Sequence, residues 1–262
     1  MSDRDWDFYL CNVNSKPASI YVDLGLKKRA PDSSRCIALC IWVYFNHPNP
    51  DNGFSTQQEF EALCAIEDAL SEAMTNSFSA IYAGRITNDG RREFYFYSDS
   101  SNDIEAKVQA ALQNFSEFKF EAWAQPDAEW SQYLTVMYPT KNDLRWITDR
   151  RVTEVMEQQG DQLITPRPIE HYSYFTNELD RSEFEKFIQK SEFKIVSKSG
   201  PFDDDSSLGL IYQKTQAATV DAIFQTTGFL DEHSEHFNGE YDGWESIVVK
   251  QKKRWWPFGN KA

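Results

Sequence analysis

Hydrophobic positions in residues 168–249 alternate between the two-residue period of strands and the 3.6-residue period of helices. Asp180 and Glu183 have the spacing of a capping box, and they open a predicted helix whose Phe184, Phe187 and Ile188 share one face. A second helix starts near Ala217. The predicted strands are 168–175, 193–197, 208–213 and 244–249. This βαββαβ order predicts a ferredoxin-like plait, one sheet with both helices on the same side.

The first half repeats this order with additions. Ser55 and Gln58 have capping-box spacing before a helix that runs to about Met74. Asn88-Asp89-Gly90 is a strong hairpin turn between two strand-like runs. The strands expected here are 6–12, 19–24, 36–45, 80–87, 93–97 and 118–123, and the further helices are 102–114, 129–137 and 142–158. We therefore expect an α+β protein with two ferredoxin-like βαββαβ plaits, the N-terminal one extended by extra strands and two trailing helices.

A domain boundary is predicted where helical patterning stops and prolines cluster, between Gln158 and Pro168. The expected domains are an acidic α+β domain at 1–160 and a second plait at 161–250. A basic, aromatic tail follows at 251–262.

The net charge of −14 is shared by both predicted domains. Residues 1–160 carry 15 basic and 24 acidic side chains, and residues 161–250 carry 8 and 17. Such a surface repels nucleic acid phosphates and attracts a basic protein, so we expect a protein partner and no direct nucleic-acid binding. Acidity is also ordinary among bacterial cytoplasmic proteins. The tail has the opposite charge, +4, and suits an anionic membrane surface, an acidic groove, or a segment that is disordered or folded back on the acidic body.

No apolar stretch is long enough to span a bilayer, and residues 1–7 are too polar for a signal peptide, so we expect a cytoplasmic protein. The four cysteines all lie in the first half, and reduced, mostly buried thiols are the expected state.

Known catalytic motifs are absent from the sequence. It contains no phosphate loop, dinucleotide fingerprint, nucleophile elbow or Cys-x-x-Cys pair. His233 and His236 are three apart late in a helix, where a solvated surface pair is more common than a metal site. His171 lies in an apolar strand, as structural histidines do. We predict no catalytic residue, no cofactor and no metal ligand.

The second predicted plait contains two distinctive runs, Ile169-Glu170-His171-Tyr172 and Glu240-Tyr241-Asp242-Gly243-Trp244. With them, residues 166–250 resemble the regulator of ribonuclease E activity, B type. The resemblance implies a small acidic cytoplasmic inhibitor that binds the endoribonuclease and modulates RNA turnover without catalysis of its own. This chain departs from the family pattern because it has the basic residues 250–262 in place of a long acidic tail.

The first half contains the run Gly84-Arg85-x-Thr87-x-Asp89-Gly90-Arg91-Arg92, followed by Phe94-Tyr95-Phe96-Tyr97. It resembles a bacterial domain family of unknown function that is found fused to the regulator domain. Exposed aromatic residues on a plait strand can stack RNA bases, but successive strand residues face opposite sides, so one aromatic pair must pack against the helices. An RNA-binding module, or an enzyme acting near Arg85, Asp89, Arg91 and Arg92, is therefore the alternative to a regulator.

The function expected first is a non-catalytic regulator that binds a ribonuclease or another basic protein. Acidic residues would steer the partner and an aromatic turn at 241–244 would anchor it. The predicted partner-binding residues are Glu240, Tyr241, Asp242 and Trp244, together with the acidic loop Asp203, Asp204 and Asp205.

Overall fold

The computed structural model describes residues 4–200 and 207–250 and divides the chain into two compact units, Met1–Thr140 and Lys141–Ala262. This division lies about twenty residues before the boundary that the prolines indicated. The reason is helix α3 (Lys141–Gln158), whose Asp149 hydrogen-bonds to Thr227 and Trp244 of the second unit. The predicted acidic loop at 203–205 and the tail at 251–262 lie outside the described residues.

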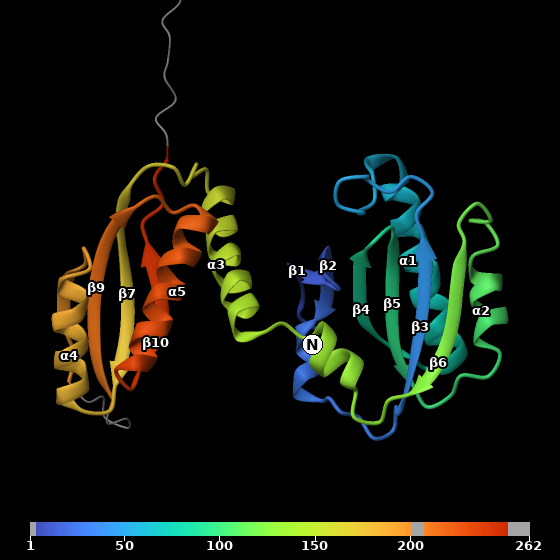
Figure 1. Ribbon diagram of the computed structural model, residues 1–262, viewed down its shortest axis with the longest axis horizontal. Coiled ribbons are helices and arrows are strands. Elements are labelled where there is room, and N and C mark those ends of the chain that lie inside the picture. Colours follow the sequence, from blue (N-terminus) through green and yellow to red (C-terminus); the bar gives the residue numbers. More distant parts are fainter. Residues whose placement is uncertain (1–3, 201–206, 251–262) are drawn as a thin grey trace, which may run out of the picture. The chain divides into compact units, whose positions relative to one another are not determined.

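An antiparallel six-stranded sheet forms the first unit, in the order β1-β2-β4-β5-β3-β6 (Figure 1). The strands are β1 (Trp6–Val13), β2 (Lys16–Asp23), β3 (Ile37–Tyr44), β4 (Ile81–Asn88), β5 (Arg91–Ser98) and β6 (Phe120–Pro126). Helices α1 (Gln57–Phe78) and α2 (Ile104–Ala111) cover one face. A 3-10 helix (Leu24–Lys28) follows β2, and a π-helix (Gln132–Met137) follows β6.

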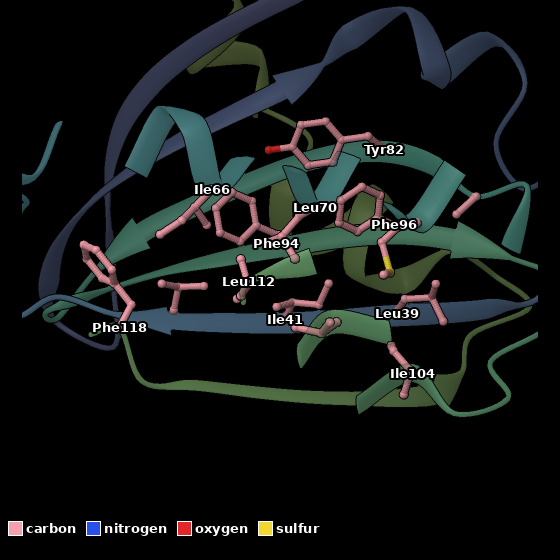
Figure 2. Packing of buried hydrophobic residues seen from close by; sticks show 14 of the residues in the cluster. Leu39, Ile41, Ile66, Leu70, Tyr82, Phe94, Phe96, Ile104, Leu112 and Phe118 are labelled. Carbon is pink, nitrogen blue, oxygen red and sulfur yellow. The ribbon is translucent and has the colours of Figure 1, made fainter. Parts of the chain in front are cut away.

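The core of the first unit lies between this sheet and its two helices (Figure 2). Phe94 and Phe96 of β5 face the helices and are fully buried, which confirms that one aromatic pair packs there. Tyr95 and Tyr97 lie on the opposite face and are buried too, with the Tyr97 ring stacked on Trp130 at a centroid distance of 3.9 Å. None of these four rings is free to stack an RNA base.

The second unit contains a four-stranded antiparallel sheet in the order β10-β7-β9-β8. Its strands are β7 (Arg167–Phe175), β8 (Lys194–Lys198), β9 (Leu208–Gln216) and β10 (Gly239–Ser246), and its helices are α3, α4 (Glu178–Gln189) and α5 (Val220–His236). Phe184 of α4 and Leu230 of α5 share one core with Phe175 and Tyr212, so both helices cover the same face. The protein is therefore α+β with two antiparallel sheets.

Three local expectations differ from the structure. Asn177, not Asp180, caps α4, because its side chain accepts a hydrogen bond from the Asp180 backbone N–H at 2.9 Å. Thr56 precedes α1 and makes no side-chain cap, so the capping box at Ser55 is wrong. The last strand begins at Gly239, because the expected turn at 241–244 is instead a bulged part of β10 paired with β7.

Among the described residues, no helix is both long and apolar enough to cross a membrane.

Candidate functional site

The run Glu240–Trp244 forms most of strand β10, and its two aromatic side chains turn toward the helices. The Tyr241 hydroxyl lies 2.9 Å from Nδ1 of His171, and the Trp244 indole N–H donates to Oδ1 of Asp149 at 2.8 Å. Glu240 and Asp242 are exposed. The two predicted aromatic anchors therefore form internal hydrogen bonds, and the two predicted carboxylates remain available at the surface.

Asp149 of α3 is the polar centre of this region. It is 2% exposed, and its Oδ2 accepts a hydrogen bond from the Thr227 hydroxyl at 2.6 Å. Burial raises the pKa of the carboxyl group, against the opposing effect of the Thr227 and Trp244 hydrogen bonds and of Arg145. Asp149 thus fastens α3 to both α5 and β10, since Thr227 belongs to one and Trp244 to the other.

A hollow of about 330 Å³ lies between α3, α5 and β10, and its lining includes Lys141, Arg145, Asp149, Asp231, Asp242 and Trp244. Its cations are already paired, since Lys141 and Arg145 both reach Asp231, at 3.0 and 3.1 Å. Gly228 lets Arg145 lie against α5, because a Cβ there would be 3.0 Å from the guanidinium. The hollow therefore offers no uncompensated cation for an anionic ligand.

His171 is fully buried between the second sheet and its helices, as a structural histidine would be. Burial, and secondarily Lys214, lowers its pKa to about 3, so the ring is neutral at physiological pH. A neutral, enclosed imidazole bonded to Tyr241 supports the packing of β10 on β7 and is poorly placed for acid–base chemistry with a substrate.

The face of the second sheet that points away from the helices is half-exposed and acidic. Glu170 of β7 stands directly opposite Glu245 of β10, and Glu240 stands opposite Tyr174. In the described part of the chain, no lysine or arginine forms an ion pair with Glu170, Glu240 or Glu245. Like charges directly opposite across an antiparallel pair are destabilising, by roughly 0.2–1 kcal/mol.

The four residues proposed for a site in the first unit do not converge. Arg85 and Arg92 both reach Glu67 of α1, at 2.9 and 3.7 Å, on the helical side of the sheet. Arg91 lies on the other face, paired with Glu93 at 2.6 Å and stacked on Trp42 at 3.9 Å. Asp89 is at the hairpin turn, where it pairs with Lys16 at 2.6 Å.

A second hollow, of about 420 Å³, lies beside Asp89. Lys16 and the loop 48–53 line it, and none of the three arginines reaches it. The described residues contain no cluster of three or more side chains suited to hold a metal ion. His233 stacks on Phe187 and hydrogen-bonds to the Phe229 carbonyl at 2.7 Å, so it packs within the second unit.

Sequence reasoning missed Asp149 and Thr227. Asp149 lies in a polar helix within the predicted first domain, and Thr227 lies in the helix predicted to start near Ala217. A buried carboxylate paired with a threonine 78 residues away leaves no local signal. Glu170 belongs to one of the runs that carry the resemblance and Glu245 directly follows the other, but their facing positions depend on the register of β10 against β7.

Comparison with known families agrees with this division of the chain. Residues 4–138 match a Family of unknown function (DUF695), and residues 146–246 match Regulator of ribonuclease activity B. The second match begins within α3, consistent with the place of that helix in the second unit.

No curated protein matches the chain. A solved structure, described as the crystal structure of an unknown protein from Galdieria sulphuraria, shares 12% identity over 80% of this chain and 98% of its own length. Its TM-score of 0.23 is too low to support any inference. Because the first match spans more than half of the residues, the chain belongs to the Family of unknown function (DUF695), and its second unit matches Regulator of ribonuclease activity B.

Proposed function

We propose that this protein is a non-catalytic regulator whose second unit binds a ribonuclease, of the ribonuclease E type, and modulates RNA turnover in the cytoplasm. The observation that carries the proposal is the match of residues 146–246 to Regulator of ribonuclease activity B. The exposed carboxylates of β10, Glu240, Asp242 and Glu245, are the proposed contact residues, joined by Glu170 across the sheet.

Electrostatics support a basic protein surface as the partner. Residues 141–250 carry 12 basic and 21 acidic side chains, a net charge of −9. A field of this sign accelerates association with a positively charged surface and slows the approach of RNA. The ribonuclease would therefore be engaged directly, without RNA as a bridge.

The proposal revises the role of the aromatic residues. Tyr241 and Trp244 hold β10 in place through His171 and Asp149, so their contribution to binding would be indirect. Glu240 and Asp242 need no rearrangement to meet a partner, since both are exposed. The predicted loop Asp203–Asp205 remains a proposed second acidic contact.

We also infer a ferredoxin-like plait in each unit, as expected for the sequence pattern. Numbered along the chain, the strands of the second sheet lie in the order fourth, first, third, second. Strands β3 to β6 of the first sheet have the same order when read from the β6 edge, with the β1–β2 hairpin added beside β4. In the second unit this arrangement leaves one face of the sheet without a described helix, whereas in the first unit the π-helix Gln132–Met137 lies on that face, where the Tyr133 backbone N–H donates to the Tyr97 hydroxyl at 3.1 Å.

A direct binding assay tests the function. Titration calorimetry of the full chain with a purified ribonuclease E-type enzyme should give a saturable complex, and the rate at which the enzyme cleaves a defined RNA should change on saturation. Association should slow as salt rises from 50 to 500 mM, since exposed charges are screened. A triple variant Glu240→Gln/Asp242→Asn/Glu245→Gln should bind at least tenfold more weakly.

The matched control is Glu178→Gln/Glu183→Gln/Glu232→Gln, which removes the same charge from exposed positions on α4 and α5. Equal losses in the two variants would mean that only net charge matters and would remove β10 as the contact surface. No saturable complex with the wild-type chain at 50 mM salt would refute the proposed function itself.

A further inference from the structure

One face of the second sheet has no covering element among the described residues of its unit. Burial alternates strictly along β7, where Ile169, His171 and Ser173 are buried while Tyr172 and Tyr174 are half-exposed. Ile211 of β9 pairs with Tyr172 and is half-exposed as well. Two tyrosines and an isoleucine therefore form an apolar strip along an accessible sheet.

Carboxylates flank this strip. Glu170 and Glu245 are a facing like-charge pair, and both lie close enough to the Tyr172 hydroxyl to help burial raise its pKa. Glu240 lies opposite Tyr174 further along β10. Lys194 of β8 pairs with Gln213, which pairs with Glu170, so Lys194 lies on the same face. It is the only lysine or arginine that the described strands place there. A complementary ligand would carry cations next to aromatic rings.

The chain contains such a segment directly after β10. Lys252, Lys253 and Arg254 precede Trp255, Trp256 and Phe258, and residues 251–262 carry a charge of +4. The last described residue, Lys250, forms an isolated antiparallel β-bridge with the backbone of Asp161, and the Val249 N–H donates to the Asp161 carboxylate at 2.7 Å. The same carboxylate holds Arg167, the first residue of β7, so the segment leaves the unit where this sheet begins.

The segment has sufficient reach. Twelve residues span up to roughly 40 Å when extended, whereas the nine residues of β7 extend about 30 Å. The segment can therefore return along the whole length of the sheet.

We propose that residues 251–262 dock on this open face, with the cations of the segment between Glu170, Glu245 and Glu240 and its tryptophans on the Tyr172–Tyr174 strip. Opposite charge relieves the repulsion of the facing glutamates, and ring contact removes apolar surface from water. The docked segment covers carboxylates that the proposed ribonuclease contact would use, so the two occupants would compete. The docking itself goes beyond the proposed function and does not depend on it.

Zero-length carbodiimide cross-linking of the dilute full chain tests the proposal, because it joins a lysine to a carboxylate only when they touch. Peptide mass spectrometry should find Lys252 and Lys253 joined to Glu170, Glu240 or Glu245. Substituting Glu170→Gln/Glu245→Gln should reduce these links at least fivefold, and 1 M salt should do the same. The charge-matched variant Glu183→Gln/Glu232→Gln, altered on the helical side, should leave them unchanged.

The aromatic contribution is tested by Trp255→Ala/Trp256→Ala, which keeps every charge and should lower the yield of links severalfold. Absence of links, or links spread equally to Glu183 and Glu232, would overturn the proposal. Isotope-mixed samples identify a second copy as the occupant, because the links would then join labelled to unlabelled chains. Since no ribonuclease is present, these outcomes are independent of whether the chain binds one.

Discussion

Trp244 on β10 donates its indole N–H to the buried carboxylate of Asp149 on α3, across 2.8 Å and 95 residues of chain. The contact ties the most distinctive run of the sequence to a helix that the pattern of prolines assigned elsewhere. It makes α3 a structural part of the second unit, since the same carboxylate also holds Thr227 of α5.

Replacing Asp149 should destabilise the second unit. Asp149→Ala removes the acceptor of the half-buried Trp244 indole N–H and leaves the Thr227 hydroxyl with only the Phe224 carbonyl, at 3.2 Å; a buried donor left unsatisfied costs about 1–3 kcal/mol. Asp149→Asn keeps one acceptor oxygen and should cost less. Chemical denaturation followed by fluorescence measures both losses, and Glu157→Ala, at an exposed position of α3, is the control. A loss no larger than that of the control would show that the carboxylate does not fasten the helix.

Stability should fall in acid through His171. Its pKa is lowered to about 3 in the fold, while an unfolded chain titrates near the ordinary value of 6.5. Between these values the unfolded state binds the extra proton, so stability is present above about pH 6.5 and declines toward pH 3, by up to about 1.4 kcal/mol per pH unit. Denaturation of the wild type and of His171→Leu across this range should show a shallower slope for the variant. Parallel slopes would contradict the prediction.

Gly84 and Gly243 should respond differently to alanine. Both have positive φ, +147° and +140°, which costs an alanine roughly 1–3 kcal/mol. At Gly84 an added Cβ would also stand 2.3 Å from the Tyr21 carbonyl oxygen, whereas at Gly243 nothing lies within 4 Å. Gly84→Ala should therefore lose more stability than Gly243→Ala in thermal unfolding. The opposite order would mean that β2 and β4 are not packed as described.

Two neighbouring cysteines should differ sharply in alkylation. Burial raises the pKa of the Cys40 thiol to about 12, with Asp127 and Glu93 adding to the shift, while Cys36 is exposed. Iodoacetamide at pH 8 should label Cys36 within minutes and reach Cys40 only after denaturation. Peptide mass spectrometry at timed intervals distinguishes the two, and early labelling of Cys40 would show that β3 opens locally.

Much of the fold could be predicted from sequence because periodicity is a local signal. The hairpin at Asn88-Asp89-Gly90 and the helix through Leu63 and Leu70 each lie where turn chemistry and apolar spacing place them. The bulge at Tyr241 and Gly243 could not be predicted, since a glycine there signals a turn equally well. The prolines after Gln158 correctly ended a helix, but they say nothing about which core that helix joins.

The candidate sites were harder to predict because they depend on register and on contacts between distant segments. Arg91 and Arg92 are adjacent in sequence and lie on opposite faces of β5, a separation that strand alternation alone predicts. The facing of Glu170 and Glu245 needs the bulge to be known. The role of Asp149 as a buried hydrogen-bond acceptor can be recognised only from the tertiary fold, because its partners Thr227 and Trp244 are distant in sequence.

The place of α3 has a practical consequence for anyone cutting the gene into halves. A fragment that starts at residue 161, the boundary predicted from the prolines, would lack α3, whose Met156 packs with Ile223 and Trp244. Its loss would expose apolar side chains to water and leave the Trp244 indole N–H without its acceptor. Such a fragment should aggregate, and a failed binding assay with it would say nothing about the intact chain. A fragment that starts at Lys141 keeps α3 packed against α5 and β10.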